Sequence, residues 1–354
     1  MELSVSAPGR VCLFGEHQDY LGLPVIPCAV NLRMVIRGST RDDGIFNIRD
    51  RVHSVSARFS LDDLEYLSDD FDYLRAVARV MLDEGKVISG ADLDLRSEVP
   101  ISSGLSSSAA MLVAFAKFLN EALSLEYDPV SLAMVCYRAE HDELGVPCGV
   151  MDQLSSSIGG VIRIDCGDSP VVEELAADIG DMVIGDTGIR KSTMDVHSAR
   201  TVEIAEAIGE LSRLTGRPVQ LEELGWDDLE RVLPRLGRVP AMRLRATVRN
   251  RDITLRAAEM LGRAKPDLEA LGSLMLQHHA NLRDDYQVSH PALDRLVRAG
   301  MSAGALGGKL TGAGLGGCVV MMAPGRGKEV ARAIRNAGGT PHIVRVDRGA
   351  RRES

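Results

Sequence analysis

The first half of the chain is patterned mainly as strands, in which apolar and polar residues alternate or short apolar runs occur. Segments of this kind are Leu3–Ala7, Val25–Val30, Leu32–Arg37, Val55–Phe59, Ala91–Arg96, Val161–Ile164 and Met182–Gly185. Helical spacing is found at Phe71–Asp83, Ala109–Leu119 and Val130–Leu144. Pro8 and Gly9 are expected to end the first strand, and the Gly- and Ser-rich segment Gly145–Gly160 is expected to be irregular.

The second half of the chain is patterned mainly as helices. They are predicted at Ser192–Leu214, Trp226–Leu236, Ala241–Leu261, Asp267–Arg283, Pro291–Met301 and Lys328–Ala337. Strands are predicted at Leu306–Thr311, Cys318–Met322 and Ile343–Val346. A strand-rich half followed by a helix-rich half predicts an α+β protein of two domains, residues 1–185 and 186–354.

The composition narrows the class of protein. The chain has 354 residues, of which 45% are hydrophobic and 26% charged, as in a soluble globular protein. A net charge of −9 argues against nucleic acid as a partner. No segment resembles a signal peptide or a membrane span, and the six cysteines lack zinc-site spacing, so we expect a cytoplasmic protein with no membrane partner. The basic segment Arg345–Arg352 is expected to be solvated.

Two clusters of small residues are candidate anion sites. Pro100–Ala110 (PISSGLSSSAA) places Gly104 and three serines before a predicted helix, whose first N–H groups attract phosphate. Gly312–Gly317 is a second glycine cluster far along the chain. A capped helix remains an alternative for the first. Neither cluster is the G-x-x-x-x-G-K-[ST] loop, and the H-R-D and D-F-G segments of protein kinases are absent from the sequence.

Three ordered segments, PGRVCLFGEHQDY, PISSGLSSSAA and KLTGAGLGGC, resemble the three motifs of the GHMP small-molecule kinases. Within that superfamily, the first segment, AEHDELGVPCGVMDQ and NLRDDYQVSHPALD resemble the galactokinase family. The resemblance implies a ribosomal-S5-like N-terminal αβ domain and a C-terminal αβ sandwich, with the active site between them. It also implies an ATP- and Mg²⁺-dependent kinase that acts on the anomeric hydroxyl of a sugar, with galactose as the first candidate. A monomer or weak homodimer is expected.

The resemblance assigns the catalytic roles to Asp152 and Arg10. Asp152 matches the carboxylate that accepts or orients the proton of the sugar hydroxyl. Arg10 matches the arginine beside it, which keeps the carboxylate ionised and stabilises charge on the phosphoryl group. Without the resemblance, the alternatives are a loop-capping carboxylate and a surface charge.

The resemblance also assigns the nucleotide and metal contacts. Ser108 and Glu140 match the magnesium ligands, for which one hydroxyl and one carboxylate suffice when phosphates and water complete the shell. The phosphates are expected to contact Gly104, Ser106, Ser107, Ser108, Gly312 and Gly314. A helix cap and a solvated charge are the structural alternatives for the serines and for Glu140.

The sugar contacts are assigned to the N-terminal motif and to the segment before Asp152. They are Glu16, His17, Asp19, Gly149 and Asp152. A structural role is the alternative for His17, and Tyr20, His278, His279, Met321 and Met322 are interpreted as packing residues.

The sequence departs from the galactokinase pattern at three places. Cys12 and Gln18 stand where that family usually has Asn and often Thr. The segment after Gly185 lacks the tyrosine that faces the sugar in that family, and His197 falls nearby. The acceptor therefore stays open between galactose, N-acetylgalactosamine, another monosaccharide and mevalonate, and a non-catalytic sugar sensor on the same fold is a further alternative.

Overall fold

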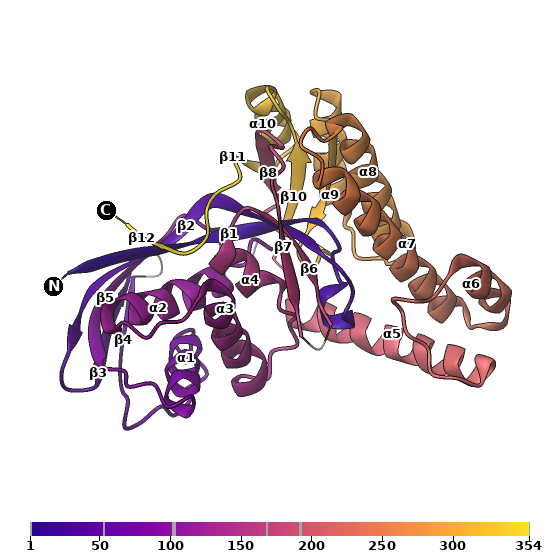
Figure 1. Cartoon of the computed structure of the whole chain (residues 1–354). Coiled ribbons are helices and arrows are strands. Elements are labelled where there is room, and N and C mark those ends of the chain that lie inside the picture. The colour runs from indigo at the N-terminus through magenta and orange to yellow at the C-terminus, as the bar shows by residue number, and fades with distance from the viewer. Residues whose placement is uncertain (1, 52–53, 101–103, 168, 191–192, 354) are drawn as a thin grey trace.

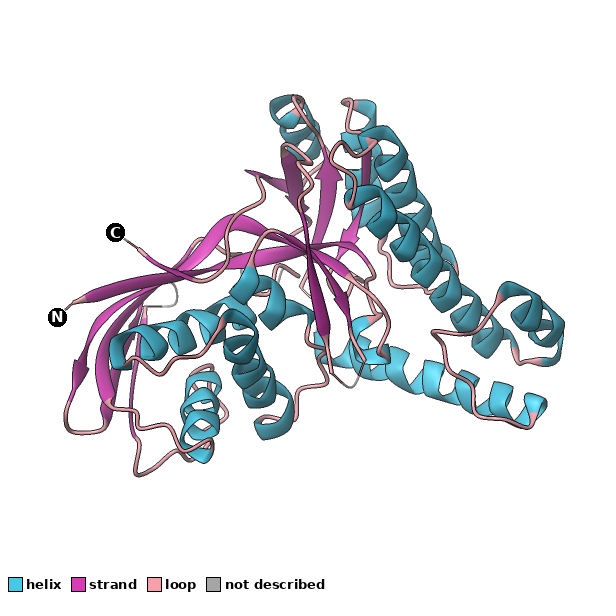
Figure 2. Ribbon diagram, viewed as in Figure 1, coloured by secondary structure: helices cyan, strands magenta, loops and turns pink. Residues whose placement is uncertain are grey.

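Two β-sheets with helices packed on them organise the computed structural model, which describes residues 2–51, 54–100, 104–167, 169–190 and 193–353 (Figure 1). The first sheet has the strand order β12-β1-β2-β5-β3-β4, with β6 paired to β2 and β7 to β6, and the second has the order β11-β8-β10-β9. Figure 2 shows the alternation of helices and strands in both parts. The predicted α+β class is confirmed. Residues 101–103 of the predicted loop and residue 192 of a predicted helix lie outside the described residues.

The first sheet is built around two long strands. Its strands are β1 (Leu3–Phe14), β2 (Ile26–Arg41), β3 (Ile45–Asp50), β4 (Val55–Ser60), β5 (Gly90–Ser97), β6 (Val161–Asp165), β7 (Val171–Leu175) and β12 (Arg351–Arg352). The predicted break at Pro8 and Gly9 is wrong, because a register shift against β2 accommodates the proline without ending β1. The two strands predicted at residues 25–37 are one strand, in which Asn31 is exposed.

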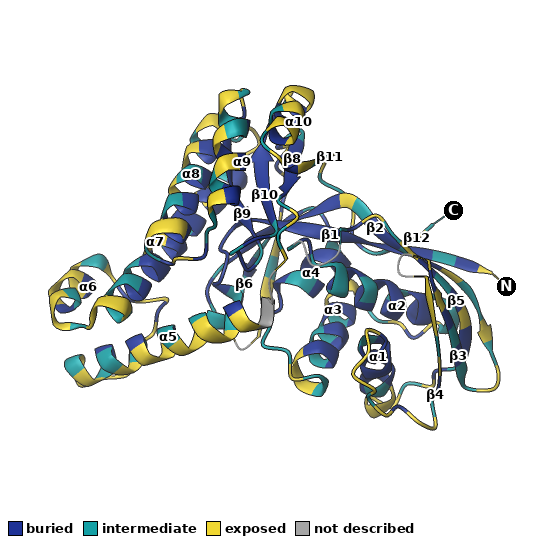
Figure 3. Cartoon of the chain, turned by 180° about the vertical axis from the view of Figure 1, so that it is seen from behind, coloured by how far each residue is buried: buried dark blue, intermediate teal, exposed yellow. Residues whose placement is uncertain are grey.

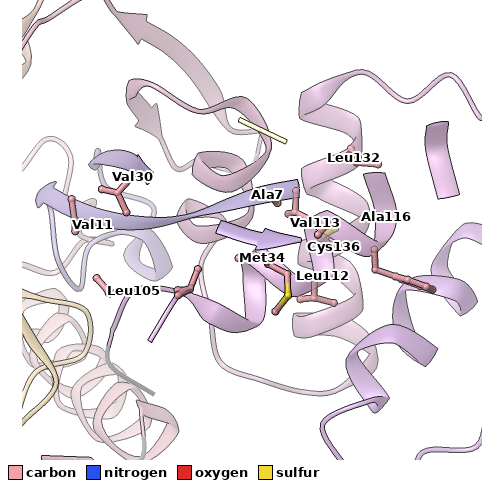
Figure 4. Close-up of a cluster of buried hydrophobic side chains, with 14 of the residues drawn as sticks. Ala7, Val11, Val30, Met34, Leu105, Leu112, Val113, Ala116, Leu132 and Cys136 are labelled. Carbon is pink, nitrogen blue, oxygen red and sulfur yellow. The ribbon is translucent and has the colours of Figure 1, made fainter. Parts of the chain in front are cut away.

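Four helices pack under the first sheet. They are α1 (Asp72–Asp83), α2 (Ser107–Leu123), α3 (Pro129–Arg138) and α4 (Met151–Ile158), and a π-helical turn, η2 (Ala139–Glu143), follows α3. Figure 4 shows how side chains of β1, β2, α2 and α3 meet in the core, with Val113 and Ala116 of α2 among them. α2 and α4 pack on β1 and β2, so the core fixes both helices relative to the strand that carries Arg10.

The second sheet consists of β8 (Met182–Asp186), β9 (Gly307–Thr311), β10 (Cys318–Met322) and β11 (Thr340–Val344). Its helices are α5 (Thr193–Thr215), α6 (Trp226–Val232), α7 (Arg238–Leu261), α8 (Leu268–Asp284), α9 (Pro291–Ser302) and α10 (Gly327–Asn336), and short 3₁₀ turns lie at η1 (Asp19–Leu21) and η3 (Leu233–Arg235). The division at residues 185/186 stays a prediction. β8, which ends at Asp186, pairs with β10 and β11 and so belongs to the second sheet.

The basic segment near the C-terminus exposes Arg345, Arg348 and Arg352, as expected, but its backbone is attached to the first sheet. β12 pairs with β1 in the first sheet, so the chain returns from the second sheet and ends beside its own N-terminal strand (Figure 1). Figure 3 shows exposed residues on the outward faces of α5, α6 and α10, while the strands of the second sheet are mostly buried. No helix among the described residues is long and apolar enough to cross a membrane.

Candidate active site

Arg10 and Asp152 form the centre of the site, although 142 residues separate them. Arg10 Nε donates to Asp152 Oδ1 at 2.7 Å, and Arg10 Nη2 lies 2.6 Å from the same oxygen. Arg10 Nη1 donates to the Gly104 carbonyl at 2.6 Å, and Ser106 Oγ donates to Asp152 Oδ2 at 2.5 Å. Both oxygens of the carboxylate therefore accept hydrogen bonds, which fix its orientation. The Asp152 side chain is 26% exposed and Arg10 only 6%, so the carboxylate is the accessible partner.

Asp152 is held in the first turn of α4. The irregular structure predicted over Gly145–Gly160 is wrong at Met151–Ile158, where the serines are buried in a helix and the hydroxyls of Ser156 and Ser157 donate to backbone carbonyls of other segments. Ser156 Oγ, for example, donates to the Pro8 carbonyl at 2.7 Å. Tertiary hydrogen bonds override the weak helix propensity of serine. They also attach the helix that carries Asp152 to the strand that carries Arg10.

The two glycine clusters, far apart in the sequence, touch each other in the structure. A Cβ on Gly104 would lie 2.7 Å from the Thr311 carbonyl, and a Cβ on Gly312 would lie 2.7 Å from the Gly104 Cα. Both glycines have positive φ angles, so only glycine fits without strain. Thr311 Oγ1 also accepts a hydrogen bond from the Cys12 N–H at 2.9 Å. The end of β9 and the start of α2 therefore lie together beside Arg10.

The three predicted phosphate-binding serines lie at the start of α2. Ser106 does not cap the helix with its side chain; it has a φ of 58° and directs its hydroxyl to Asp152. Ser107 and Ser108 occupy the first two positions of α2, where free backbone N–H groups are available. Gly314 instead packs against backbone, since a Cβ there would lie 2.1 Å from the Val288 carbonyl.

Glu140 and Ser108, the predicted magnesium pair, are brought together. Glu140 lies on η2, where it is buried and accepts a hydrogen bond from Gln153 Nε2 at 2.6 Å and another from Ser108. Burial, and next the charge of Asp152, raise the pKa of Glu140 to about 7. π-Helical turns often occur at functional sites. Glu140 is thus a buried carboxylate whose ionised form a cation would stabilise.

Asp19, a predicted sugar contact, lies against Gly149. A Cβ on Gly149 would lie 2.3 Å from Asp19 Oδ2, so no larger residue fits there without displacing the carboxylate. Burial, and next the charge of Asp152, raise the pKa of Asp19 to about 7. Asp19, Gly149 and Asp152 therefore border one region, as predicted.

Glu16, another predicted sugar contact, is in a buried ion pair with Lys309. The two side chains are 1% and 0% exposed, and Glu16 Oε2 accepts a hydrogen bond from Lys309 Nζ. Lys309 Nζ also donates to the carbonyls of Cys12 and Leu310, at 3.1 and 2.9 Å. Burial raises the pKa of Glu16, and Lys309 opposes the rise. Of the two carboxylate oxygens of Glu16, Oε1 has no hydrogen-bond partner among the described residues.

His17 lies in a cluster of rings beside this ion pair. His17 Nδ1 is 2.8 Å from the Tyr20 hydroxyl and Nε2 is 3.0 Å from the Ala313 carbonyl, so both nitrogens have protein partners. Its ring centroid lies 5.1 Å from that of Tyr286 and 5.2 Å from that of His197. Burial, and next the proximity of His197, lower the pKa of His17 well below its ordinary value, so its ring is neutral.

Sequence reasoning missed four residues of the site. Tyr20 was interpreted as packing, yet its hydroxyl lies 2.8 Å from His17 Nδ1 and 3.3 Å from the Tyr286 hydroxyl. Lys309 and Thr311 lie in the motif KLTGAGLGGC, of which only glycines are predicted to be site residues. Tyr286 lies in the galactokinase-like segment at residues 281–294. All four residues lie within segments that resemble family motifs, which is the signal that could have identified them. Their contacts could not be predicted from spacing along the chain.

The two adjacent histidines of α8 and the adjacent methionines of β10 are structural, as interpreted. His278 is buried and stacks on Phe14 with centroids 6.2 Å apart, and His279 lies 3.2 Å from Asp294. Met321 and Met322 are buried. The described residues contain no group of three or more His, Cys, Asp or Glu side chains arranged to hold a metal ion.

Three family models match the chain. The GHMP kinases N terminal domain matches residues 72–160, the GHMP kinases C terminal domain matches residues 257–340, and the galactokinase galactose-binding signature matches residues 2–40. Galactokinase of Haemophilus influenzae (strain Rd) is 34% identical, over 91% of this chain and 85% of its own length. The chain belongs to the galactokinase family. Bos taurus galactokinase is 35% identical, over 91% and 83% of the two chains, and that of Thermococcus kodakarensis is 30% identical, over 94% and 93%.

Solved structures of the superfamily share the fold. Lactococcus lactis galactokinase complexed with galactose superposes with a TM-score of 0.87 and 25% identity, over 99% of this chain and 95% of that one. Methanococcus jannaschii mevalonate kinase gives a TM-score of 0.74 at 20% identity, over 98% and 99% of the two chains, which shows a common fold alone. The predicted two-domain GHMP kinase fold is confirmed.

Proposed function

We propose that this protein is an ATP-dependent kinase that transfers a phosphoryl group to the anomeric hydroxyl of galactose. The observation that carries the proposal is the geometry at Asp152: both carboxylate oxygens are oriented by Arg10 and Ser106, and the side chain is partly exposed. The galactokinase relatives and the galactose complex of the Lactococcus lactis enzyme support galactose as the acceptor.

The residues at the centre of the site fit phosphoryl transfer. Asp152 accepts or orients the proton of the attacking hydroxyl, and the adjacent Arg10 stabilises negative charge on the transferring group. Gly104, Gly312 and the N–H groups of Ser107 and Ser108 would hold the phosphates, because backbone can approach them closely there.

Ser108 and Glu140 fit a magnesium ion bound together with ATP. Glu140 is buried, and the side chains that donate hydrogen bonds to it, Gln153 and Ser108, are uncharged, so a cation would stabilise its ionised form. Mg²⁺ commonly takes one or two protein oxygens and fills the rest of its octahedral shell with phosphate and water. The ion would supply neutralisation of phosphate charge.

The sugar is assigned to the region bordered by Asp19, Gly149 and Asp152, with the rings of His17 and His197 close to it. Carboxylates that accept hydrogen bonds from sugar hydroxyls discriminate strongly, because a missing hydroxyl leaves a buried acceptor unpaired. Glu16, whose Oε1 is buried and has no hydrogen-bond partner among the described residues, is the remaining candidate sugar contact.

The test is ADP release with ATP, Mg²⁺ and a panel of galactose, N-acetylgalactosamine, glucose and mevalonate. Galactose-dependent release, with phosphorus NMR placing the product phosphate on the anomeric oxygen, supports the proposal. Release with another acceptor only would reassign the substrate, and galactose binding without release would indicate a sensor. The cytoplasmic location and the monomeric or weakly dimeric state are further parts of the proposal, the second tested by gel filtration.

A further inference from the structure

The segment formed by residues 347–353, here called the C-terminal strap, lies against both elements that carry the catalytic pair. On one side, its β12 residues pair with Val5 and Ser6 of β1, the strand of Arg10. On the other side, it contacts the C-terminal end of α4, the helix whose first turn holds Asp152.

The contact between the strap and α4 is close and made by backbone. The Ala350 N–H donates to the Ser157 carbonyl at 3.0 Å, and the Gly160 N–H donates to the Asp347 carbonyl at 2.8 Å. A Cβ on Gly349 would lie 2.1 Å from the Ser157 carbonyl oxygen. Gly159, which ends α4, has equally little room, since its own Cβ would lie 1.9 Å from the backbone nitrogen of Gly349. Any side chain at either glycine forces the strap and the helix apart.

Arg33 of β2 fastens the strap. Its side chain is 8% exposed. Nη1 donates to Asp347 Oδ2 at 2.7 Å and to the Arg348 carbonyl at 2.9 Å, and Nη2 donates to the Gly349 carbonyl at 2.8 Å. Nε and Nη2 donate to the hydroxyl and carbonyl of Ser6, at 2.6 and 3.2 Å. All donors of the guanidinium are thus used, and they join β1 to the strap.

We propose that the C-terminal strap and Arg33 position α4 against β1 and thereby set the contact between Asp152 and Arg10, an inference that rests on the proposed function. α4 has eight residues and is about 12 Å long, so a displacement at its C-terminal end reaches Asp152. Reaction rates are sensitive to misplacement of catalytic groups by about 1 Å, which can cost about 10²-fold. Arg33, Asp347 and Gly349 are positioning residues, because their hydrogen bonds and close contacts in the described part of the chain go to β1, the strap and α4, not to Asp152 or Arg10.

Gly349→Ala is the decisive variant and Gly167→Ala its matched control. Gly349 has no positive φ angle, so alanine there adds only the clash with the backbone of Ser157 and Ile158, whereas a Cβ on Gly167 meets nothing within 4 Å. We expect G349A to lower kcat by about tenfold or more while the KM for ATP changes little, since the phosphate loops are untouched. G167A is expected to match the wild type. A folded G349A protein with wild-type kcat overturns the proposal.

Cys148 supplies a readout that does not depend on activity. It is the one partly exposed cysteine, lying just before α4, and the five others are buried. If the strap holds α4 in place, G349A increases the rate at which a thiol reagent labels Cys148, and C148S removes that signal. A labelling rate equal to that of G167A contradicts the inference. A wild type inactive toward galactose would instead overturn the proposed function alone.

Arg33→Lys serves if G349A does not fold. Lysine keeps the positive charge at position 33 but has fewer donors in a different geometry. It should therefore lose some of the hydrogen bonds to the strap and loosen it. Lowered kcat at unchanged KM for ATP, with faster Cys148 labelling, supports the inference. A kcat and a labelling rate equal to those of the wild type overturn it.

Discussion

Ser106 and Asp152 explain why the start of α2 and the start of α4 act as one unit. Ser106, at a left-handed φ of 58°, uses its hydroxyl to donate to Asp152 Oδ2 at 2.5 Å instead of capping its own helix. The loop assigned to the phosphates is thereby tied to the carboxylate assigned to the sugar hydroxyl. Strained backbone of this kind is typical of functional sites.

Asp152→Asn removes the proton acceptor and leaves the size of the side chain unchanged. We expect kcat to fall by about 10²–10⁴-fold, while the Kd for ATP, measured by titration calorimetry, changes little. Asp165→Asn, an exposed carboxylate paired with Arg163, is the control and should keep wild-type activity. A D152N protein with wild-type kcat would show that Asp152 does not handle the proton.

Ser106→Ala separates the orientation of Asp152 from its charge. One of the two carboxylate oxygens loses its protein donor, while the ion pair with Arg10 persists. We expect a smaller loss of kcat than in D152N, of about 10–100-fold, which corresponds to one hydrogen bond to a charged group at about 1.5–3 kcal/mol. Steady-state kinetics measure it, and a loss as large as that of D152N would contradict the distinction.

Magnesium dependence should change with pH through Glu140. The pKa of this carboxyl is raised to about 7, chiefly by burial. Below pH 7 a proton competes with the metal, so the magnesium concentration for half-maximal rate should fall as pH rises from 6 to 8. In Glu140→Gln, the magnesium concentration for half-maximal rate should be higher than in the wild type at every pH, and it should vary less with pH. A profile in E140Q that is as steep as in the wild type would assign the titration to another group.

Gly149→Ala tests the position of Asp19. The new Cβ would lie 2.3 Å from Asp19 Oδ2, so the carboxylate must move. We expect the KM for galactose to rise by about tenfold or more, since a displaced acceptor loses about one hydrogen bond. The KM for ATP should stay near the wild-type value. Parallel rises in both KM values would instead indicate general damage to the site.

The sequence motifs predicted which residues lie together in the site, and the chemistry of their side chains predicted the role of each. Arg10, Asp152, the two glycine clusters and the pair of Ser108 and Glu140 lie together in the structure, as the resemblance implied. A motif does not show which distant residue each side chain contacts. Glu16 is an example, because its partner Lys309 is 293 residues away and no spacing rule predicts that contact. Motif matches identify residue types but not which of their atoms are already used.

The elements that were missed depend on distant partners. α4 is helical despite its serines because the hydroxyls of Ser156 and Ser157 bond to other segments, and β1 continues through Pro8 because the register against β2 shifts there. The basic residues 345–352 have the composition of a solvated end, yet Arg33, far away in the sequence, fixes them. Local propensity therefore predicted most elements and failed where tertiary contacts decide.

His197 is expected to contribute to recognition of the sugar. Its ring lies 5.2 Å from that of His17 and 5.4 Å from that of Tyr20, and the charges of both Asp152 and Arg10 act on it. Burial lowers its pKa more than Asp152 raises it, so the ring is neutral near pH 7; its N–H donates to the Pro147 carbonyl, which leaves the other nitrogen as an acceptor. His197→Phe keeps a ring without the two nitrogens, and we expect the KM for galactose to rise by about 5–10-fold, with kcat less affected.

His197→Gln, which can still donate and accept, should have a KM for galactose closer to that of the wild type, and His141→Phe, an exposed control, should match the wild type. Equal KM values in all three variants would show that His197 only packs against His17.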